Sequence, residues 1–217
     1  MNTEQARFNM VEQQIRTWDV LDDHVLDTIQ SIPREAFVPA SYQSLAFADL
    51  EIPLGHGQVM MSPKVEGRML QALQIKPDEL VLEIGTGSGF VTSCLAKMSA
   101  SVTSLEIFQE LSEQAQQHTG AANISNVDFI VADVFECLHN LKNYDVIAVT
   151  GSSPQELVQL AAHLQPGGRM FSIIGNQPVM TATLTTCISQ DSYRNEKLFE
   201  TSLPSLIMPP AEKEFIF

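Results

Sequence analysis

Basic residues are scarce in this chain, and their scarcity limits the partners that it can bind unaided. The 217 residues include 12 Lys and Arg against 26 Asp and Glu, which gives a formal net charge of −14. Contacts with the phosphates of DNA, RNA or an anionic membrane depend on Lys and Arg, and the sequence has no Lys/Arg cluster. The composition therefore predicts no nucleic-acid partner and no membrane partner.

Long apolar runs and divisions of the chain are also lacking. No apolar stretch approaches the length that spans a bilayer, and the first residues, Met1 to Arg7, are not followed by the apolar core of a signal peptide. We therefore expect a cytoplasmic protein. Because no Ser/Gly/Pro-rich linker or charge block interrupts the sequence, we expect one domain over residues 1–217. Its expected parts are an N-terminal segment (1–78), a core (79–175) and C-terminal strands (176–217).

Cysteine and histidine are too few and too scattered to indicate a metal centre. Cys94, Cys137 and Cys187 are odd in number and widely spaced, which favours neither a disulfide framework nor a zinc site. The five histidines show no metal-ligand spacing either. The sequence therefore predicts no metal, and reduced cysteines that pack as small hydrophobes.

A glycine-rich motif follows the apolar run Val81-Leu82-Glu83-Ile84 and continues as Gly85-Thr86-Gly87-Ser88-Gly89. The apolar residues suit a buried parallel strand, and the glycines allow a tight turn and close approach to a ligand before a helix that begins near Ser88. A dinucleotide loop, G-x-G-x-x-G, would need glycine at position 90, which is Phe, so a nicotinamide-dependent oxidoreductase is disfavoured. The pattern E-x-G-x-G-x-G instead resembles the first motif of class I methyltransferases, which bind S-adenosylmethionine (SAM). An ordinary strand-to-helix turn is the alternative.

Two later segments, each predicted to form a strand, end in acidic residues. The run 101–106 ends at Glu106, whose carboxylate can accept hydrogen bonds from ribose hydroxyls, and Ile107 follows it. The run 127–133 ends at Asp133, and in the methyltransferase pattern an acid here binds the adenine amino group, with Val134 beside it. The alternatives are a solvated acid at a strand end for Glu106 and a turn-forming Asp for Asp133. The predicted cofactor site consists of Glu83, Gly85, Thr86, Gly87, Ser88, Gly89, Glu106, Ile107, Asp133 and Val134.

Alternating helical and strand patterns predict the fold class. A strand is expected over 144–150 and another over 169–175, with a helix between them that starts at Ser152 or Ser153 with Pro154 and ends at 165–168. We therefore expect a doubly wound, mostly parallel, Rossmann-like α/β sheet with helices on both faces. Apolar residues at helical spacing near the N-terminus predict a helical extension whose core positions are Phe8, Val11, Ile15 and Trp18, then Val25, Leu26, Ile29 and Ile32.

The segments before the glycine loop closely resemble one methyltransferase family. The segments 10–16, 32–39 and 52–58, followed by Ser62-Pro63 opening a helix that runs to about Leu73, resemble protein-L-isoaspartate O-methyltransferases in content and order. The resemblance extends to about Gly175, and Phe215-Ile216-Phe217 is only loosely similar to the family's C-terminal strand. It implies methyl transfer from SAM to the carboxylate of isoaspartyl or D-aspartyl residues in damaged proteins or peptides, as the first step of repair.

One part of the family pattern differs in this sequence. In the family, Gly-Gln is followed by Thr-Ile-Ser, a variable residue and Pro, whose hydroxyls help to hold the acceptor carboxylate. Here Gly57-Gln58 is followed by Val59-Met60-Met61-Ser62-Pro63, so Val59 and Met61 stand at the hydroxyl positions and cannot donate hydrogen bonds. The catalytic candidates are therefore Met61, as part of an adaptable apolar wall for a different acceptor or only as packing; Ser62, as a replacement donor or only a helix cap; and His56, as an acceptor-site donor or base.

Three hypotheses follow from the sequence. The first is an isoaspartyl carboxyl methyltransferase with normal or altered activity. The second is a SAM-dependent methyltransferase for another acceptor, because both hydroxyls are replaced. The third is a SAM-binding homologue without turnover that acts through partners.

Overall fold

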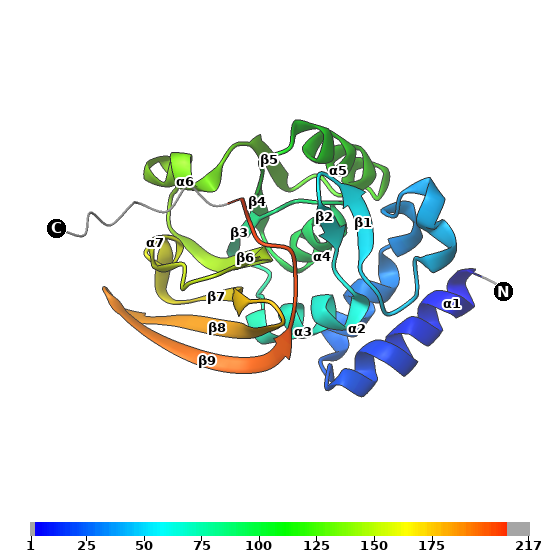
Figure 1. Cartoon of the computed structure of the whole chain (residues 1–217), viewed down its shortest axis with the longest axis horizontal. Helices are drawn as coiled ribbons and strands as arrows, with labels where there is room; N and C mark the ends of the chain where they lie inside the picture. The colour runs from blue at the N-terminus through cyan, green and yellow to red at the C-terminus, as the bar shows by residue number, and fades with distance from the viewer. Residues whose placement is uncertain (1–2, 208–217) are drawn as a thin grey trace.

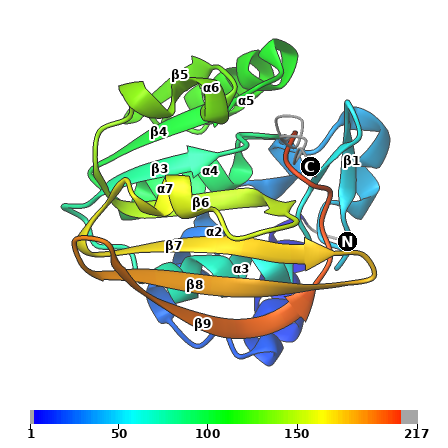
Figure 2. The same cartoon turned by 60° about the vertical axis from the view of Figure 1, so that its left-hand side comes forward.

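Seven strands form one twisted sheet in the computed structural model, which describes residues 3–207 (Figure 1). Figure 2 shows the sheet face-on, with the strand order β5-β4-β3-β6-β7-β8-β9. The strands are β3 (Leu80–Ile84), β4 (Ser101–Glu106), β5 (Val127–Val131), β6 (Tyr144–Ser153), β7 (Leu164–Asn176), β8 (Val179–Ser189) and β9 (Ser192–Thr201). Strands β3, β4, β5, β6 and β7 run parallel, and β8 and β9 add an antiparallel edge.

The strand order places a crevice at the carboxyl ends of the central strands. The chain starts the sheet at β3, adds β4 and β5 on one side, and then returns to add β6 and β7 on the other. Connections therefore leave β3 and β6 in opposite directions, and open α/β sheets bind ligands at such a switch point. The doubly wound, mostly parallel α/β fold expected from the sequence is confirmed.

Helices cover both faces of the sheet, and an N-terminal extension packs beside them. The extension comprises α1 (Thr3–Met10), a π-helical turn η1 (Val11–Ile15), the 3₁₀ turn η2 (Arg16–Trp18), α2 (Asp23–Ser31), η3 (Arg34–Ala36) and η4 (Ala40–Leu45). A hairpin of β1 (Ile52–Gly55) and β2 (Gln58–Met60) follows. The remaining helices are α3 (Pro63–Leu73), α4 (Phe90–Met98), α5 (Gln109–Ala121), α6 (Val134–Cys137), η5 (Leu138–Asn140) and α7 (Val158–Ala161). Within residues 3–207, no helix is long and apolar enough to cross a membrane.

Two apolar cores follow from the alternation of side chains along the buried strands. On one face, Val81, Val146 and Phe171 pack against the N-terminal extension, α3 and α4. On the other face, Leu82, Ile147 and Met170 pack in a smaller core with residues of α6 and α7. Successive residues of a strand point to opposite faces, so strands covered on both sides read as continuous apolar runs.

Local helical periodicity gave two wrong expectations. The helix expected from Pro154 to the Gly167-Gly168 pair is much shorter than predicted and consists of α7 alone. It is short because β6 continues to Ser153 and β7 already begins at Leu164. Pairing with neighbouring strands outweighs the helical spacing of the apolar residues there. In the extension, Val11 and Ile15 are buried as expected, but Phe8 and Trp18 are 46% and 44% exposed. Lys64 partly covers the Trp18 ring, with its Nζ 4.4 Å from the ring centroid.

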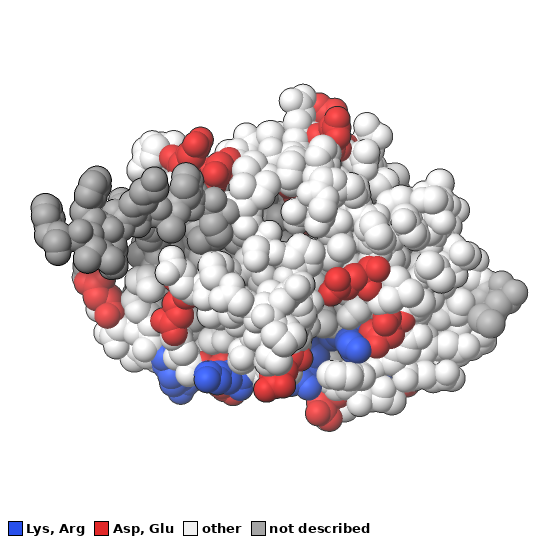
Figure 3. Space-filling model, viewed as in Figure 1, with Lys and Arg blue, Asp and Glu red and all other residues white. Residues whose placement is uncertain are grey.

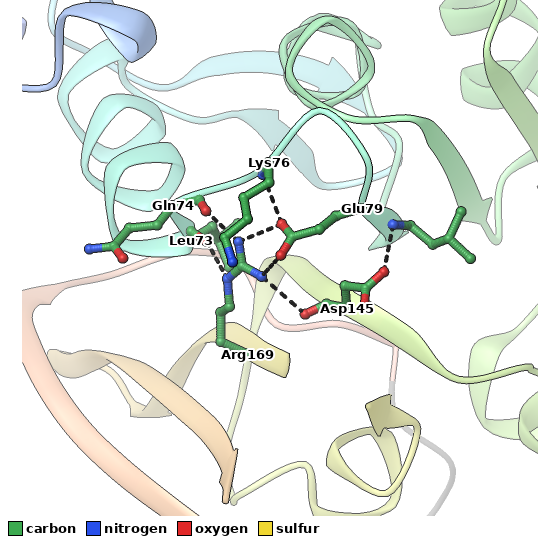
Figure 4. Close-up of polar contacts among 7 residues, drawn as sticks. Leu73, Gln74, Lys76, Glu79, Asp145 and Arg169 are labelled. Carbon is green, nitrogen blue, oxygen red and sulfur yellow. Dashed lines mark hydrogen bonds and ion pairs between the residues drawn. The ribbon is translucent and has the colours of Figure 1, made fainter. Parts of the chain in front are cut away.

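A cluster around Arg169 connects the end of α3 with the start of β3, as Figure 4 shows. The guanidinium donates to the Leu73 and Gln74 carbonyls, which end α3, and pairs with Glu79 at 2.6 Å. Burial would raise the pKa of Glu79, but hydrogen bonds and charge from Arg169 and Lys76 outweigh it and hold that pKa below its usual value. This cluster fixes the amino end of β3, opposite the crevice.

Many basic side chains are paired with acids. The pairs include Arg7 with Glu35, Arg16 with Glu12, Lys64 with Asp49 and Arg68 with Asp19. On the face in Figure 3, the Lys and Arg side chains lie in its lower part, next to acidic ones.

Candidate functional site

A cleft opens at the carboxyl ends of the parallel strands, where the strand order predicts it. Its empty volume is about 640 Å³ with the open mouth included. Its lining comes from the ends of four neighbouring strands, the β2 segment and the chain after β9. The lining residues are Gln58, Val59, Ile84, Gly85, Gly87, Leu105, Glu106, Ile107, Phe108, Ala132, Asp133, Val134, Phe135, Thr150, Gly151, Leu206 and Ile207.

The glycine loop forms the floor of this cleft, and two of its glycines are required by close contacts. Gly85 has φ +93°, and a Cβ there would collide with the Thr150 hydroxyl, which donates to the carbonyls of Ile84 and Gly85. Gly89 has φ +85°, and a Cβ there would lie about 3 Å from the Ala115 backbone of α5. The sequence predicted a helix from Ser88. It begins at Phe90, because Gly89 is left-handed and occupies the N-cap position.

Glu106 joins the loop to the end of β4. Its carboxylate is 5% exposed and lines the cleft. One oxygen accepts from the Gly87 N–H at 2.9 Å and the other from the Phe108 N–H at 3.1 Å. Each carboxylate oxygen has a second lone pair, so this fixed group can also accept hydrogen bonds from two hydroxyls of a ligand in the cleft.

Glu83 lies beneath the loop. It is fully buried, and its Oε2 accepts from the hydroxyls of Thr92 and Ser104, both at 2.6 Å. Ser104 lies 2.6 Å from the Thr86 hydroxyl, so the acid reaches the loop through this chain. Burial, offset in part by the two hydroxyl bonds and reinforced by the charge of Glu106, raises the pKa of Glu83 to about 8. We infer that Glu83 positions the loop, since the described cleft lining does not include it.

The other predicted cofactor residues divide between two cavities. Asp133 caps α6 by accepting from the Phe135 N–H at 2.8 Å, and it lines the large cleft with Ile107 and Val134. Thr86 and Ser88 line a smaller neighbouring cavity instead. Gly85 and Gly87 line both.

The smaller cavity, with an empty volume of about 290 Å³, lies against the segment that departs from the family pattern. Met60 and Met61 are both 4% exposed and line it beside the glycine loop. Val59 and Thr150 line both this cavity and the large cleft. A ligand in the cleft and a second one in the smaller cavity would therefore meet at the glycine loop. The full lining is Leu54, Val59, Met60, Met61, Glu66, Gly85, Thr86, Gly87, Ser88, Val91 and Thr150.

The other two catalytic candidates lie outside the described linings of both cavities. Ser62 stands at the N-cap of α3, but its hydroxyl does not cap the helix, and the side-chain cap expected from Ser-Pro is wrong. His56 lies at the hairpin tip with φ +52°. Its Nε2 is 2.8 Å from a Glu110 carboxylate oxygen, and its ring stacks on Phe108 at 4.3 Å. His56 thus holds the hairpin against the cleft wall.

Sequence reasoning missed a buried ion pair beside the smaller cavity. Arg34 is fully buried and pairs with Glu66, which is 1% exposed and lines that cavity. Glu66 was detectable, since it has the same helical spacing as the buried Met69, Leu70 and Leu73. An acid on the apolar stripe of a helix is unusual unless it is paired.

The model of the protein-L-isoaspartate (D-aspartate) O-methyltransferase family matches residues 5–199. The chain belongs to this family. Proteins named protein-L-isoaspartate O-methyltransferase from Aeropyrum pernix and Rhodopseudomonas palustris are 34% and 35% identical to it. The two alignments cover 94% and 93% of this chain and 80% and 82% of the relatives.

Solved structures of the family share the fold. A candidate protein-L-isoaspartate O-methyltransferase from Plasmodium falciparum, solved in complex with S-adenosyl-L-homocysteine, superposes with a TM-score of 0.79. The match covers 95% of this chain and 98% of that one, at 20% identity. A second protein-L-isoaspartate O-methyltransferase gives a TM-score of 0.77 at 23% identity, over 92% of this chain and 65% of that chain.

The cleft fits SAM, the cofactor of protein-L-isoaspartate O-methyltransferases. Its described lining contains two carboxylates, Glu106 and Asp133, and no Lys or Arg. A dinucleotide would bring phosphates that favour cations or helix N-termini, whereas SAM has no phosphate and carries a positive sulfonium. The fixed Glu106 carboxylate suits the ribose hydroxyls, and apolar Ile107, Val134 and Phe135 suit the faces of an adenine ring.

Proposed function

We propose that this chain methylates the free carboxylate of isoaspartyl or D-aspartyl residues in damaged proteins or peptides, as the first step of their repair. Family membership supports the reaction, and the single observation that carries it is the junction of the two cavities at Val59, Gly85, Gly87 and Thr150. When bound in the large cleft, SAM supplies an activated methyl group. The cytoplasmic location expected from the sequence stays a prediction.

The residues of the chain supply alignment and exclusion of water. Glu106 is proposed to hold the ribose, Asp133 the adenine amino group, and the loop Gly85–Gly89 the remainder of SAM. Glu83 keeps the loop in place through Ser104 and Thr86. Since a carboxylate is already ionised at neutral pH, the reaction needs orientation behind the methyl group rather than a general base. The apolar wall of Met60 and Met61 excludes water there.

A second acceptor class is supported by one observation. Val59 and Met61 cannot donate hydrogen bonds, and an anion that is buried without donors is costly. A SAM-dependent transfer to a different acceptor, or a SAM-binding role without turnover, is therefore the competing proposal.

Methyl transfer to a matched peptide pair tests the proposal. Labelled SAM is offered with an isoaspartyl peptide and with its normal aspartyl twin, while SAM binding is measured by calorimetry. Selective labelling of the isoaspartyl peptide is the expected result. Tight SAM binding with neither peptide labelled would reject the repair reaction and favour another acceptor or a non-catalytic role.

A further inference from the structure

The smaller cavity contains one polar group that no hydrogen bond explains. Glu66 lines the cavity, and its Oε1 is buried with no hydrogen-bond partner among residues 3–207. Its other oxygen, Oε2, accepts from Arg34. Three buried carboxylate oxygens have no partner among residues 3–207: Glu35 Oε2, Glu66 Oε1 and Glu83 Oε1. Of these three residues, Glu66 is the one that lines the smaller cavity, and the combination of an unpaired buried oxygen with a cavity points to a ligand there.

Arg34 is held in place and cannot move to take that role. Its Nε donates to the Ala46 carbonyl at 2.9 Å, its Nη2 to the Met61 carbonyl at 2.8 Å, and its Nη1 to Glu66. The guanidinium also lies 4.8 Å from the centroid of the Phe90 ring. Glu66 Oε1 is thus the polar side-chain atom that this pair offers to the cavity.

We propose that Glu66 holds the acceptor carboxylate by donating a hydrogen bond from its protonated carboxyl group, in place of the hydroxyls that Val59 and Met61 lack. This inference rests on the proposed isoaspartyl reaction and names the group that orients its substrate.

Charge balance in the buried cluster gives the physical reason. With Glu66 ionised, Arg34 and Glu66 together are neutral, so the pair cannot balance the negative charge of an entering carboxylate, and only the sulfonium of SAM in the large cleft would oppose it. Two carboxylates in one site share a proton instead, because both cannot ionise at short distance. When Glu66 takes up a proton, its own negative charge is lost, and the positive charge of Arg34 balances that of the acceptor carboxylate instead. Burial, opposed by the charge and hydrogen bond of Arg34, raises the pKa of Glu66 to about 7, so this proton is available near neutrality.

Other titratable groups near Glu66 do not replace it. The Cys94 thiol of α4 lies in the same environment, but burial and the charge of Glu66 raise its pKa well above the usual value, so it stays neutral. On α3 itself, Lys64 pairs with Asp49 and Arg68 with Asp19.

Charged groups on the elements that pack against α3 are exposed, as His24 and Asp27 of α2 are, or have partners elsewhere. Glu12 of η1 pairs with Arg16 of η2, and Asp23 of α2 lies 3.7 Å from Arg16. Arg169 of β7 pairs with Glu79. The β6 carboxylate, Asp145, accepts from the Leu80 N–H.

The proton takes no part in the bond changes. A lone pair of the acceptor carboxylate forms the O–CH₃ bond while the C–S bond of SAM breaks and its electron pair stays on sulfur. The carboxylate and the sulfonium both become neutral. Glu66 keeps its proton during transfer and releases it to solvent after the uncharged ester leaves.

The pH dependence of isoaspartyl methylation tests the role of Glu66. In the unmodified protein, kcat/KM is expected to fall about tenfold between pH 7.5 and 8.5, mainly through KM, as Glu66 loses its proton. In Glu66→Gln, the amide oxygen can still accept from Arg34 and the amide N–H can donate to the acceptor carboxylate, but the side chain cannot titrate. It should give a flat profile and about thirtyfold higher kcat/KM than the unmodified protein at pH 8.5, where only about one Glu66 in thirty is protonated. Glu79→Gln is the matched control, because Glu79 is also paired with an arginine (Figure 4) but directly precedes β3, whereas the smaller cavity lies after the carboxyl end of β3. It should keep the unmodified profile.

A binding measurement gives a readout that a structural role would not change. With S-adenosyl-L-homocysteine bound, calorimetry of isoaspartyl peptide binding at pH 8 in two buffers of different ionisation enthalpy should show uptake of about one proton, and none in Glu66→Gln. If the unmodified protein methylates the peptide but takes up no proton, or Glu66→Gln keeps the falling profile, the role of Glu66 is refuted and the reaction stands. If the unmodified protein binds SAM but labels no isoaspartyl peptide, the proposed function fails, and this inference fails with it.

Discussion

The buried acid beneath the glycine loop should make the protein less stable as the pH rises. Glu83 has a pKa of about 8 in the folded protein against 4.5 for the free group, because burial outweighs its hydrogen bonds from Ser104 and Thr92. Between these two values the folded state binds more protons than the unfolded state. The free energy of unfolding therefore falls as the pH rises from about 4.5 to about 8.

The size of the effect follows from the two pKa values. Between pH 5.5 and 7.5, Glu83 alone should lower the free energy of unfolding by about 2–3 kcal/mol. Glu83→Gln removes this dependence, while any fixed loss from its unpaired amide is the same at every pH. The difference in stability between Glu83→Gln and the unmodified protein should therefore shift in favour of the variant by about 2–3 kcal/mol over this range. Glu66, whose pKa is raised to about 7, acts in the same direction in both proteins and cancels.

Urea unfolding at several pH values, followed by fluorescence and circular dichroism, measures this difference. Glu79→Gln is the control, since the pKa of Glu79 is lowered and its contribution is constant above pH 5. Its difference from the unmodified protein should not change with pH. If the difference in stability between Glu83→Gln and the unmodified protein is also constant between pH 5.5 and 7.5, Glu83 is already ionised in the folded protein over this range. The conclusion that burial raises its pKa is then wrong.

Three further predictions concern the two cavities. Glu106→Ala should weaken SAM binding by about 30-fold or more in calorimetry, because it removes the proposed ribose acceptor and leaves the Gly87 N–H unpaired; unchanged affinity would contradict the assignment. Gly85→Ala should lower stability by about 1–3 kcal/mol, since its Cβ meets the Thr150 hydroxyl, and Thr150→Ala in the same chain should recover part of the loss in thermal unfolding. Met61→Ser should raise kcat/KM for an isoaspartyl peptide by about fivefold if a hydroxyl at this position orients the acceptor, and no rise would exclude that explanation.

Elements with strong local signals were predicted from the sequence. The helix from Pro63 to Leu73 has a Pro at its first position and an apolar stripe, and the structure forms it over those residues. The strand from Ser101 to Glu106 was also predicted with its observed bounds. The helix expected from Ser152 or Ser153 to 165–168 forms only as the short α7, because strand pairing, a long-range interaction, extends β6 and β7 into that segment. Ser152 bonds to Pro204 and Leu206, some fifty positions later, and local periodicity contains no information on such contacts.

The sequence by itself determined the fold class, the glycine loop and the acids that follow it, because these depend on residue types at short, fixed spacings. The tertiary structure decided which of these residues face a ligand. It placed Glu83 beneath the loop and His56 on Phe108, and it brought Arg34 to Glu66 across 32 positions of chain. Burial and pairing arise from contacts between distant segments, and they set the charge and hydrogen-bonding capacity of a side chain. The chemistry of the acceptor cavity is therefore a property of the folded chain.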